Sequence, residues 1–229
     1  MSTRLAAFLA LLVTTVCHAG GLSVSPMRLD FNAERGITIV TLSNTSRETL
    51  TIEAEVVPWP AGAASQSPKD LVVNPPIATL APGEKVAVRV GLVRRLGVDV
   101  ERGYRVYFTE LPNLRPQEAL GVGVRLRLGI PVFVAAARAQ ARPLEWSAGR
   151  DGEGVFLTAS NPGNVHQRVS ALTALLGTAR YVAAQSSPYM MPGSSTSFRL
   201  PGLVAEAGDK LMLQVQANDT PRQLEVQLP

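Results

Sequence analysis

Few side chains in this sequence could carry out covalent chemistry. Of its two histidines and single cysteine, His18 and Cys17 lie in an apolar N-terminal segment, which leaves His166. A Ser–His–acid triad would have to use His166, yet the sequence contains no Gly-x-Ser-x-Gly elbow. Its carboxylates do not cluster, and no second His or Cys accompanies His166 as a metal ligand. The sequence therefore predicts no catalytic residue, no metal site and no cofactor.

The most regular spacing lies in residues 120–134. Aliphatic side chains occupy every even position from Leu120 to Val134, and the odd positions 121–131 carry glycine, arginine or proline. Strict period two predicts a strand with one aliphatic face and one small or cationic face. Two interpretations stay open. The aliphatic face packs into the domain's own core, or the strand is an open edge that pairs with a partner chain and lends it these side chains.

The first residues, 1–19, predict a secretory signal peptide. An apolar run follows Arg4, and Ala19 supplies the small residue expected before a cleavage site. This run is too short for a membrane-spanning helix, so we expect no membrane insertion of the mature chain. The only cysteine lies inside the segment, so an exported mature chain would carry no disulfide.

Composition indicates a globular protein rich in loops. The 229 residues are 46% hydrophobic and 17% charged, with 19 glycines and 17 prolines. The net charge of +4 is spread along the chain without a basic run, which argues against nucleic acid as a partner. The length fits two β-sandwich domains of about 100 residues each.

Short alternating segments separated by Gly, Pro and Asn turns predict an all-β chain. We expect an N-terminal domain over 20–137 that includes the 120–134 strand, a linker over 138–143, and a C-terminal domain over 144–229. No repeat between the two halves is apparent. The expected strands are 22–31, 36–42, 49–57, 71–73, 77–80, 85–90 and 103–111, then 144–146, 154–159, 168–172, 197–200, 210–215 and 224–226.

Several motifs follow one another in a characteristic order: Val24–Phe31, Leu42–Asn44, Pro75-Pro76 before Leu80–Glu84, Tyr104–Pro112, Val122–Val134 and Asn161–Asn164. Their order resembles that of the PapD-like periplasmic chaperones that assemble pili in the chaperone–usher pathway. The resemblance implies two immunoglobulin-like β-sandwich domains in an L-shaped arrangement. It also implies an ATP-independent protein that binds pilus subunits, completes their fold with a donor strand and delivers them to an outer-membrane usher.

The resemblance also assigns roles to single residues. Val122, Val124 and Leu126 match the donor-strand side chains that fill the groove of a subunit. Arg28 matches the cleft arginine that holds the C-terminal carboxylate of the subunit, but Pro131 stands where the main branch has a second, lysine anchor. The sequence shares features with the archaic or alternative branch, in which the anchor is an arginine at the position of Arg105. Arg127 is a further candidate for this role.

Other interpretations remain at this stage. Each of the three arginines could be an ordinary solvated residue on a strand face. The whole chain could be a secreted structural pilus subunit or a carbohydrate-binding module, although it lacks the cysteine pair of the first and the surface aromatics of the second. An exposed donor strand would also allow the free protein to self-associate.

Overall fold

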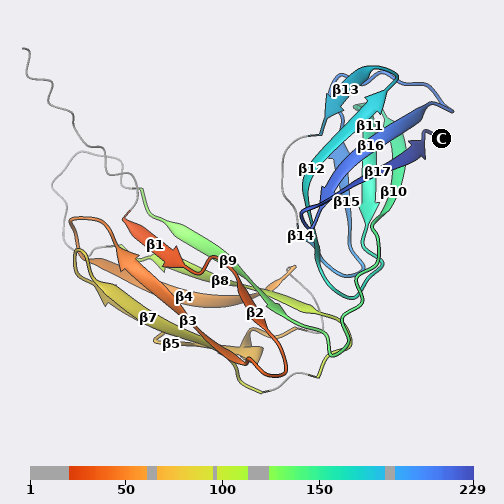
Figure 1. The fold of residues 1–229 in the computed structure, drawn as a ribbon. Helices are drawn as coiled ribbons and strands as arrows, with labels where there is room; N and C mark the ends of the chain where they lie inside the picture. The colour runs from red at the N-terminus through yellow and green to blue at the C-terminus, as the bar shows by residue number, and fades with distance from the viewer. Residues whose placement is uncertain (1–20, 61–65, 95–96, 113–123, 184–188) are drawn as a thin grey trace, which may run out of the picture.

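The computed structural model describes residues 21–60, 66–94, 97–112, 124–183 and 189–229. This part of the chain contains seventeen strands and one short 3-10 helix, and it forms two lobes set at an angle and joined at one end (Figure 1). The prediction of an all-β fold in two domains is confirmed. The expected signal peptide lies outside the described residues.

The first lobe is a sandwich of two sheets, with strand orders β1-β3-β7-β5 and β2-β9-β8-β4-β6. Alternate residues of both sheets point inward, and the buried core includes Leu42, Ile52, Leu80, Tyr104 and Phe108. Its elements are β1 (Leu22–Ser25), β2 (Leu29–Phe31), β3 (Ile37–Asn44), β4 (Leu50–Trp59), η1 (Pro68–Asp70), β5 (Leu71–Asn74), β6 (Ile77–Leu80), β7 (Lys85–Leu92), β8 (Arg102–Glu110) and β9 (Arg127–Val134).

The strand predicted over 120–134 is found as β9, which begins only at Arg127. Residues 124–126 are not part of a strand, and 120–123 lie outside the described residues. The ladder with β8 begins at the pair of Thr109 with Arg127, and β8 ends one residue further on. A strand needs a paired neighbour, so β9 starts where β8 can support it.

The second lobe is also a sandwich, with one sheet in the order β10-β11-β15 and the other in the order β13-β12-β16-β17. The sequence did not predict β13, which is a four-residue hairpin arm, or β14, which has two residues and pairs with β12. Its strands are β10 (Glu145–Asp151), β11 (Gly154–Ser160), β12 (Gln167–Leu176), β13 (Ala179–Val182), β14 (Tyr189–Met190), β15 (Ser195–Arg199), β16 (Lys210–Ala217) and β17 (Thr220–Gln227).

The two lobes share a local repeat that the sequence did not suggest. Asn44, buried at the end of β3, donates from Nδ2 to the carbonyl of Leu80, and its own carbonyl accepts from Gly83 in a Pro-Gly turn. Asn161, buried just after β11, donates from Nδ2 to the carbonyl of Met190. Its backbone carbonyl accepts from the N–H of Gly193, in the Pro-Gly turn that follows β14. One asparagine and one turn, far apart in each half, are too sparse a pattern to stand out as a repeat.

Candidate functional site

One edge of β9 is only partly covered. The chain changes sheets after β1, so that β2 pairs in parallel with β9, but only at Val132–Val134. No strand in the described residues pairs with this edge over Arg127–Pro131. Pro131 has no N–H to donate, which suits an edge strand. The backbone groups of this stretch are therefore available to another chain.

The aliphatic face of β9 runs from the core out to solvent. Ile130 and Val132 are fully buried, and Leu128 and Leu126 pack at the margin of the same core. Val124 is 79% exposed. The own-core interpretation is thus correct for the aliphatic residues of β9, whereas Val124, which precedes the strand, presents its side chain to solvent. Val122, the third expected donor residue, lies outside the described residues.

Arg105 lies on the opposite face of this sheet, directly across from Pro131 in the pairing of β8 with β9. Its guanidinium carbon is 4.3 Å from the ring centroid of Trp59. The Nε of Arg105 is buried and has no hydrogen-bond partner in the described part of the chain. An unsatisfied buried donor costs about 1–3 kcal/mol, so a bound acceptor would stabilise this side chain.

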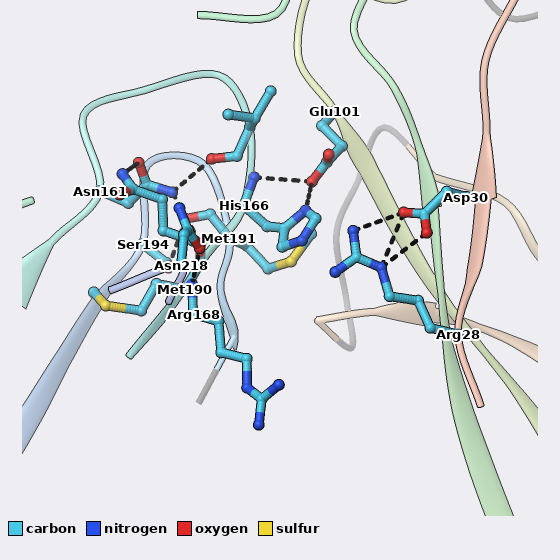
Figure 2. A network of polar contacts seen from close by, with 12 residues as sticks. Arg28, Asp30, Glu101, Asn161, His166, Arg168, Met190, Met191, Ser194 and Asn218 are labelled. Atoms are coloured by element: carbon cyan, nitrogen blue, oxygen red, sulfur yellow. Dashed lines mark hydrogen bonds and ion pairs between the residues drawn. The ribbon is translucent and has the colours of Figure 1, made fainter. Parts of the chain in front are cut away.

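Arg28 lies just before β2 and is already paired. Its guanidinium donates to both carboxylate oxygens of Asp30 at 2.7–3.0 Å and stands 4.9 Å from the ring centroid of Phe133. The hydrogen bond to Asp30 outweighs partial burial and raises the pKa of Arg28 above its ordinary value. Figure 2 shows the guanidinium pointing from the first lobe toward the second.

Arg127 lies away from the other two arginines. It starts β9, four residues and about 13 Å along the strand from Pro131. Its guanidinium lies 3.3 Å from a carboxylate oxygen of Glu55 and 4.0 Å from the ring centroid of Tyr107. The side chain is half exposed. It therefore resembles the solvated strand-face residue that the sequence allowed.

An aromatic cluster at the junction of the lobes brings Arg28 and Arg105 together. We call Trp59, Phe133, His166 and Tyr189 the junction cluster. The ring of Phe133 stacks on that of His166 at 3.7 Å and lies 6.0 Å from Trp59. The ring of Tyr189 meets Trp59 edge-on at 5.6 Å. Each arginine thus stacks on one member of a cluster to which both lobes contribute.

Hydrogen bonds also join the lobes at this point. Glu101, which is 8% exposed, accepts from the backbone N–H of His166 at 2.9 Å and bonds the ring Nδ1 at 2.6 Å (Figure 2). The side-chain amide of Asn164 donates to the carbonyls of Asp99 and Arg138, both at 2.8 Å. His166 is therefore a residue of the domain junction.

Sequence reasoning missed most of this junction. Phe133 was the available signal, because it is a large apolar side chain on the otherwise small or cationic face of the 120–134 segment. Such a residue indicates that a second surface covers that face. The contacts of Trp59 with Tyr189 carry no local sequence signal, since the two residues are far apart in the chain.

Comparison with known proteins identifies the family. Residues 21–138 match the family described as "Pili and flagellar-assembly chaperone, PapD N-terminal domain". The chain belongs to this family. The fimbrial chaperone YcbF of Escherichia coli strain K12, itself described as uncharacterized, is 29% identical to this chaperone over 167 residues. The match covers 68% of this chain and 69% of YcbF.

Solved structures share the fold over both lobes of the chaperone. The YadV chaperone superposes with a TM-score of 0.66 at 16% identity, covering 91% of this chain and all of that one. The CsuC–CsuE chaperone–tip adhesion subunit complex of Acinetobacter baumannii gives 0.64 at 21% identity, covering 92% of this chain and all of the matched chain. The family match favours a chaperone over a structural pilus subunit or a carbohydrate-binding module. The described part of the chain has no helix long and apolar enough to cross a membrane.

Proposed function

We propose that this protein is a periplasmic chaperone that binds pilus subunits by strand addition at β9 and delivers them to an outer-membrane usher. One observation carries the proposal. The edge of Arg127–Pro131 is uncovered in the described structure, and it lies beside an arginine with an unsatisfied donor.

Strand addition would pair the open backbone groups of β9 and would also complete the core of the subunit. A subunit strand paired to Arg127–Pro131 would fill the open backbone positions of β9. The aliphatic face would then continue past Leu126 and Val124 into the core of the subunit. Each aliphatic side chain that becomes fully buried contributes about 1.5–3 kcal/mol. A chaperone of the same fold has been solved in a pre-assembly complex with a tip adhesion subunit, which supports a pilus subunit as the partner.

Arg105 is the preferred anchor for the C-terminal carboxylate of the subunit. Asp30 already neutralises Arg28, and Glu55 accompanies Arg127. Arg105 instead stacks on an uncharged ring, and its buried Nε–H has no partner within the described ranges of the chain. A guanidinium fork matches a carboxylate with two parallel hydrogen bonds, and the chain end would neutralise the charge of Arg105.

The test is the affinity of purified chaperone variants for one pilus subunit from the same genome. Losing one member of a desolvated charge pair costs about 2–5 kcal/mol, so Arg105→Ala should weaken binding roughly 30- to 4000-fold. Arg105→Lys should restore only part of the affinity, because an ammonium lacks the fork. Arg28→Ala should have a smaller effect, and Arg127→Ala serves as the matched control. Wild-type affinity in Arg105→Ala would rule out Arg105 as the anchor, and wild-type affinity in all three alanine variants would place the anchor outside these arginines.

A further inference from the structure

We infer that Trp59 and Tyr189 position the guanidinium of Arg105, so that the second domain sets the geometry of a carboxylate site in the first. This inference rests on the proposed function, because it takes Arg105 as the anchor. It assigns a task to two members of the junction cluster, and it makes the junction between domains part of the binding site.

Trp59 orients Arg105 without occupying its hydrogen-bond donors. A guanidinium carries its N–H groups in its own plane, so a ring stacked on its face leaves them available. The 4.3 Å separation between the guanidinium carbon and the Trp59 ring centroid is within the range of a cation–π contact. Asp30 does the opposite at Arg28, where it occupies both Nε and Nη2.

Tyr189 supports Trp59 from the second domain. Trp59 is the last residue of β4, and its ring is only partly buried. The ring of Tyr189 contacts it edge-on, with an interplanar angle of 80°, while Phe133 contacts it at 49°. Tyr189 itself is held in β14, where it pairs with Arg168 of β12. Removing the Tyr189 ring would therefore free one side of Trp59 and loosen the platform under Arg105.

The ring of Tyr189, and not its hydroxyl, makes the contact with Trp59. The inference therefore depends on the ring alone. Tyr189→Phe tests this point, because it removes the hydroxyl and keeps the ring.

The first measurement needs no ligand. The Nε–Hε NMR signal of Arg105, assigned by its loss in Arg105→Lys, should carry a ring-current shift from Trp59. Trp59→Leu should abolish this shift and Tyr189→Ala should reduce it, whereas Tyr189→Phe should preserve it. Trp146→Leu and Tyr181→Ala are matched controls, because both residues pack on the core of the second lobe. Their variants report any general loss of folding.

The second measurement uses N-acetylphenylalanine and its amide as probes. The free acid should shift the Arg105 signal of the wild-type protein and the amide should not. Tyr189→Ala should weaken the response to the acid about tenfold, and Tyr189→Phe should stay within about twofold of wild type.

The outcomes separate the two ideas. An equal response of the wild-type protein to acid and amide would contradict the carboxylate anchor itself. An Arg105 signal and acid affinity that are unchanged in Tyr189→Ala would overturn the inference that the second domain positions Arg105.

Discussion

The three candidate arginines differ in their partners. All lie on or beside the sheet that contains β9, and a sequence pattern treats them alike. Asp30 binds Arg28 through two oxygens and Glu55 accompanies Arg127, while the Nε of Arg105 has no hydrogen-bond partner among the described residues. A cation that already has a carboxylate partner gains less from a second one. The absence of a carboxylate partner in the described part of the chain thus favours Arg105 as the anchor for the C-terminal carboxylate of a subunit.

The two expected donor residues within the described structure, Val124 and Leu126, should respond differently to a charge. Val124→Glu should leave the stability of the free chaperone unchanged, because Val124 is exposed. Leu126→Glu should lower the free energy of unfolding by about 1–3 kcal/mol, since Leu126 packs at the margin of the core. Both should abolish recovery of a co-expressed pilus subunit. Urea denaturation and co-purification measure the two effects.

Arg125→Gln is the control for this pair of variants. Arg125 lies between the two aliphatic residues and is exposed, so its replacement should preserve both folding and subunit recovery. If Val124→Glu and Leu126→Glu recover as much subunit as the wild type, the donor role is excluded for these positions.

The sequence could indicate the strand and its inward face, but not how its neighbours complete the site. Period two in residues 120–134 is a local property, and it correctly assigned the buried side chains of Ile130 and Val132. The pairing of Arg28 with Asp30 was also within reach, because residues two apart share a face of an extended chain. The contact of Trp59 with Tyr189 depends on how two domains pack, and no local pattern encodes that.

Among the elements, the two asparagine-anchored turns replace regular pairing at the ends of strands. The Nδ2 of Asn44 reaches the carbonyls of Glu48 and Leu80, and the Nδ2 of Asn161 reaches those of Val165 and Met190. Both asparagines are 1% exposed. Each side chain therefore satisfies one carbonyl in a buried hydrogen bond, that of Leu80 or Met190, and a second carbonyl that is only partly buried.

Replacing either asparagine should destabilise its own domain. Asn44→Ala and Asn161→Ala each leave one buried carbonyl unpaired, that of Leu80 or Met190, which costs about 1–3 kcal/mol. Differential scanning calorimetry should show one lowered transition in each variant, from a different domain. Asn32→Ala is the control, because Asn32 is an exposed turn residue and its loss should cost less. Unchanged transitions in both variants would show that these hydrogen bonds contribute little.

The short helix η1 is tied to β8 by a buried pair. The hydroxyl of Tyr104 donates to Asp70 at 2.8 Å. Burial acts to raise the pKa of Asp70, but hydrogen bonds from the Ser67 backbone and Tyr104, together with the charge of Arg102, leave it below its ordinary value of 3.8. Burial and the hydrogen bond to Asp70 raise the pKa of Tyr104 above its ordinary value of 10.0.

These shifts predict how the stability of the first domain depends on pH. A lowered carboxyl pKa stabilises the fold above about pH 4, and this contribution is lost as the pH falls through the native pKa. A raised tyrosine pKa stabilises the fold below about pH 10, and this contribution is lost as the pH rises further. The stability difference between wild type and Tyr104→Phe should therefore be largest between these limits. Urea denaturation across the pH range measures it, and a difference independent of pH would contradict the pairing.

At the scale of the whole molecule, one turn contributes many of the hydrogen bonds at the domain junction. The segment 161–164 stood out in the sequence only as a turn, yet its last residue, Asn164, bonds to five backbone groups there. Its side chain donates to the carbonyls of Asp99 and Arg138 and accepts from the N–H of Gln140. Its backbone carbonyl accepts from the N–H of Glu101 at 2.9 Å, and its backbone N–H donates to the carbonyl of Gln140 at 3.2 Å. The angle between the lobes is thus set by directional bonds as well as by the junction cluster.

Loosening this turn should broaden the distribution of interdomain angles without unfolding either domain. Asn164→Ala removes three side-chain hydrogen bonds at the junction and leaves the cores of both sandwiches intact. The only cysteine of the sequence, Cys17, lies in the expected signal peptide. Spin labels on cysteines introduced at the exposed positions Arg89 and Arg222 can therefore report distances between the lobes. Double electron–electron resonance should show a broader distribution of distances between the two spin labels in Asn164→Ala than in the same double-cysteine protein with Asn164 intact.

This prediction links domain geometry to binding, because the lobe that carries Tyr189 also carries Asn164. Asn164→Ala should weaken subunit binding in proportion to the broadening, and the effect should vanish in an Arg105→Ala background if the carboxylate anchor is what the junction positions. Asn32→Ala is the matched control, since Asn32 is exposed and its side chain accepts from the backbone N–H groups of Glu34 and Arg35 in its own turn. A narrow, unchanged distance distribution in Asn164→Ala would show that the junction cluster alone is enough to fix the angle between the domains.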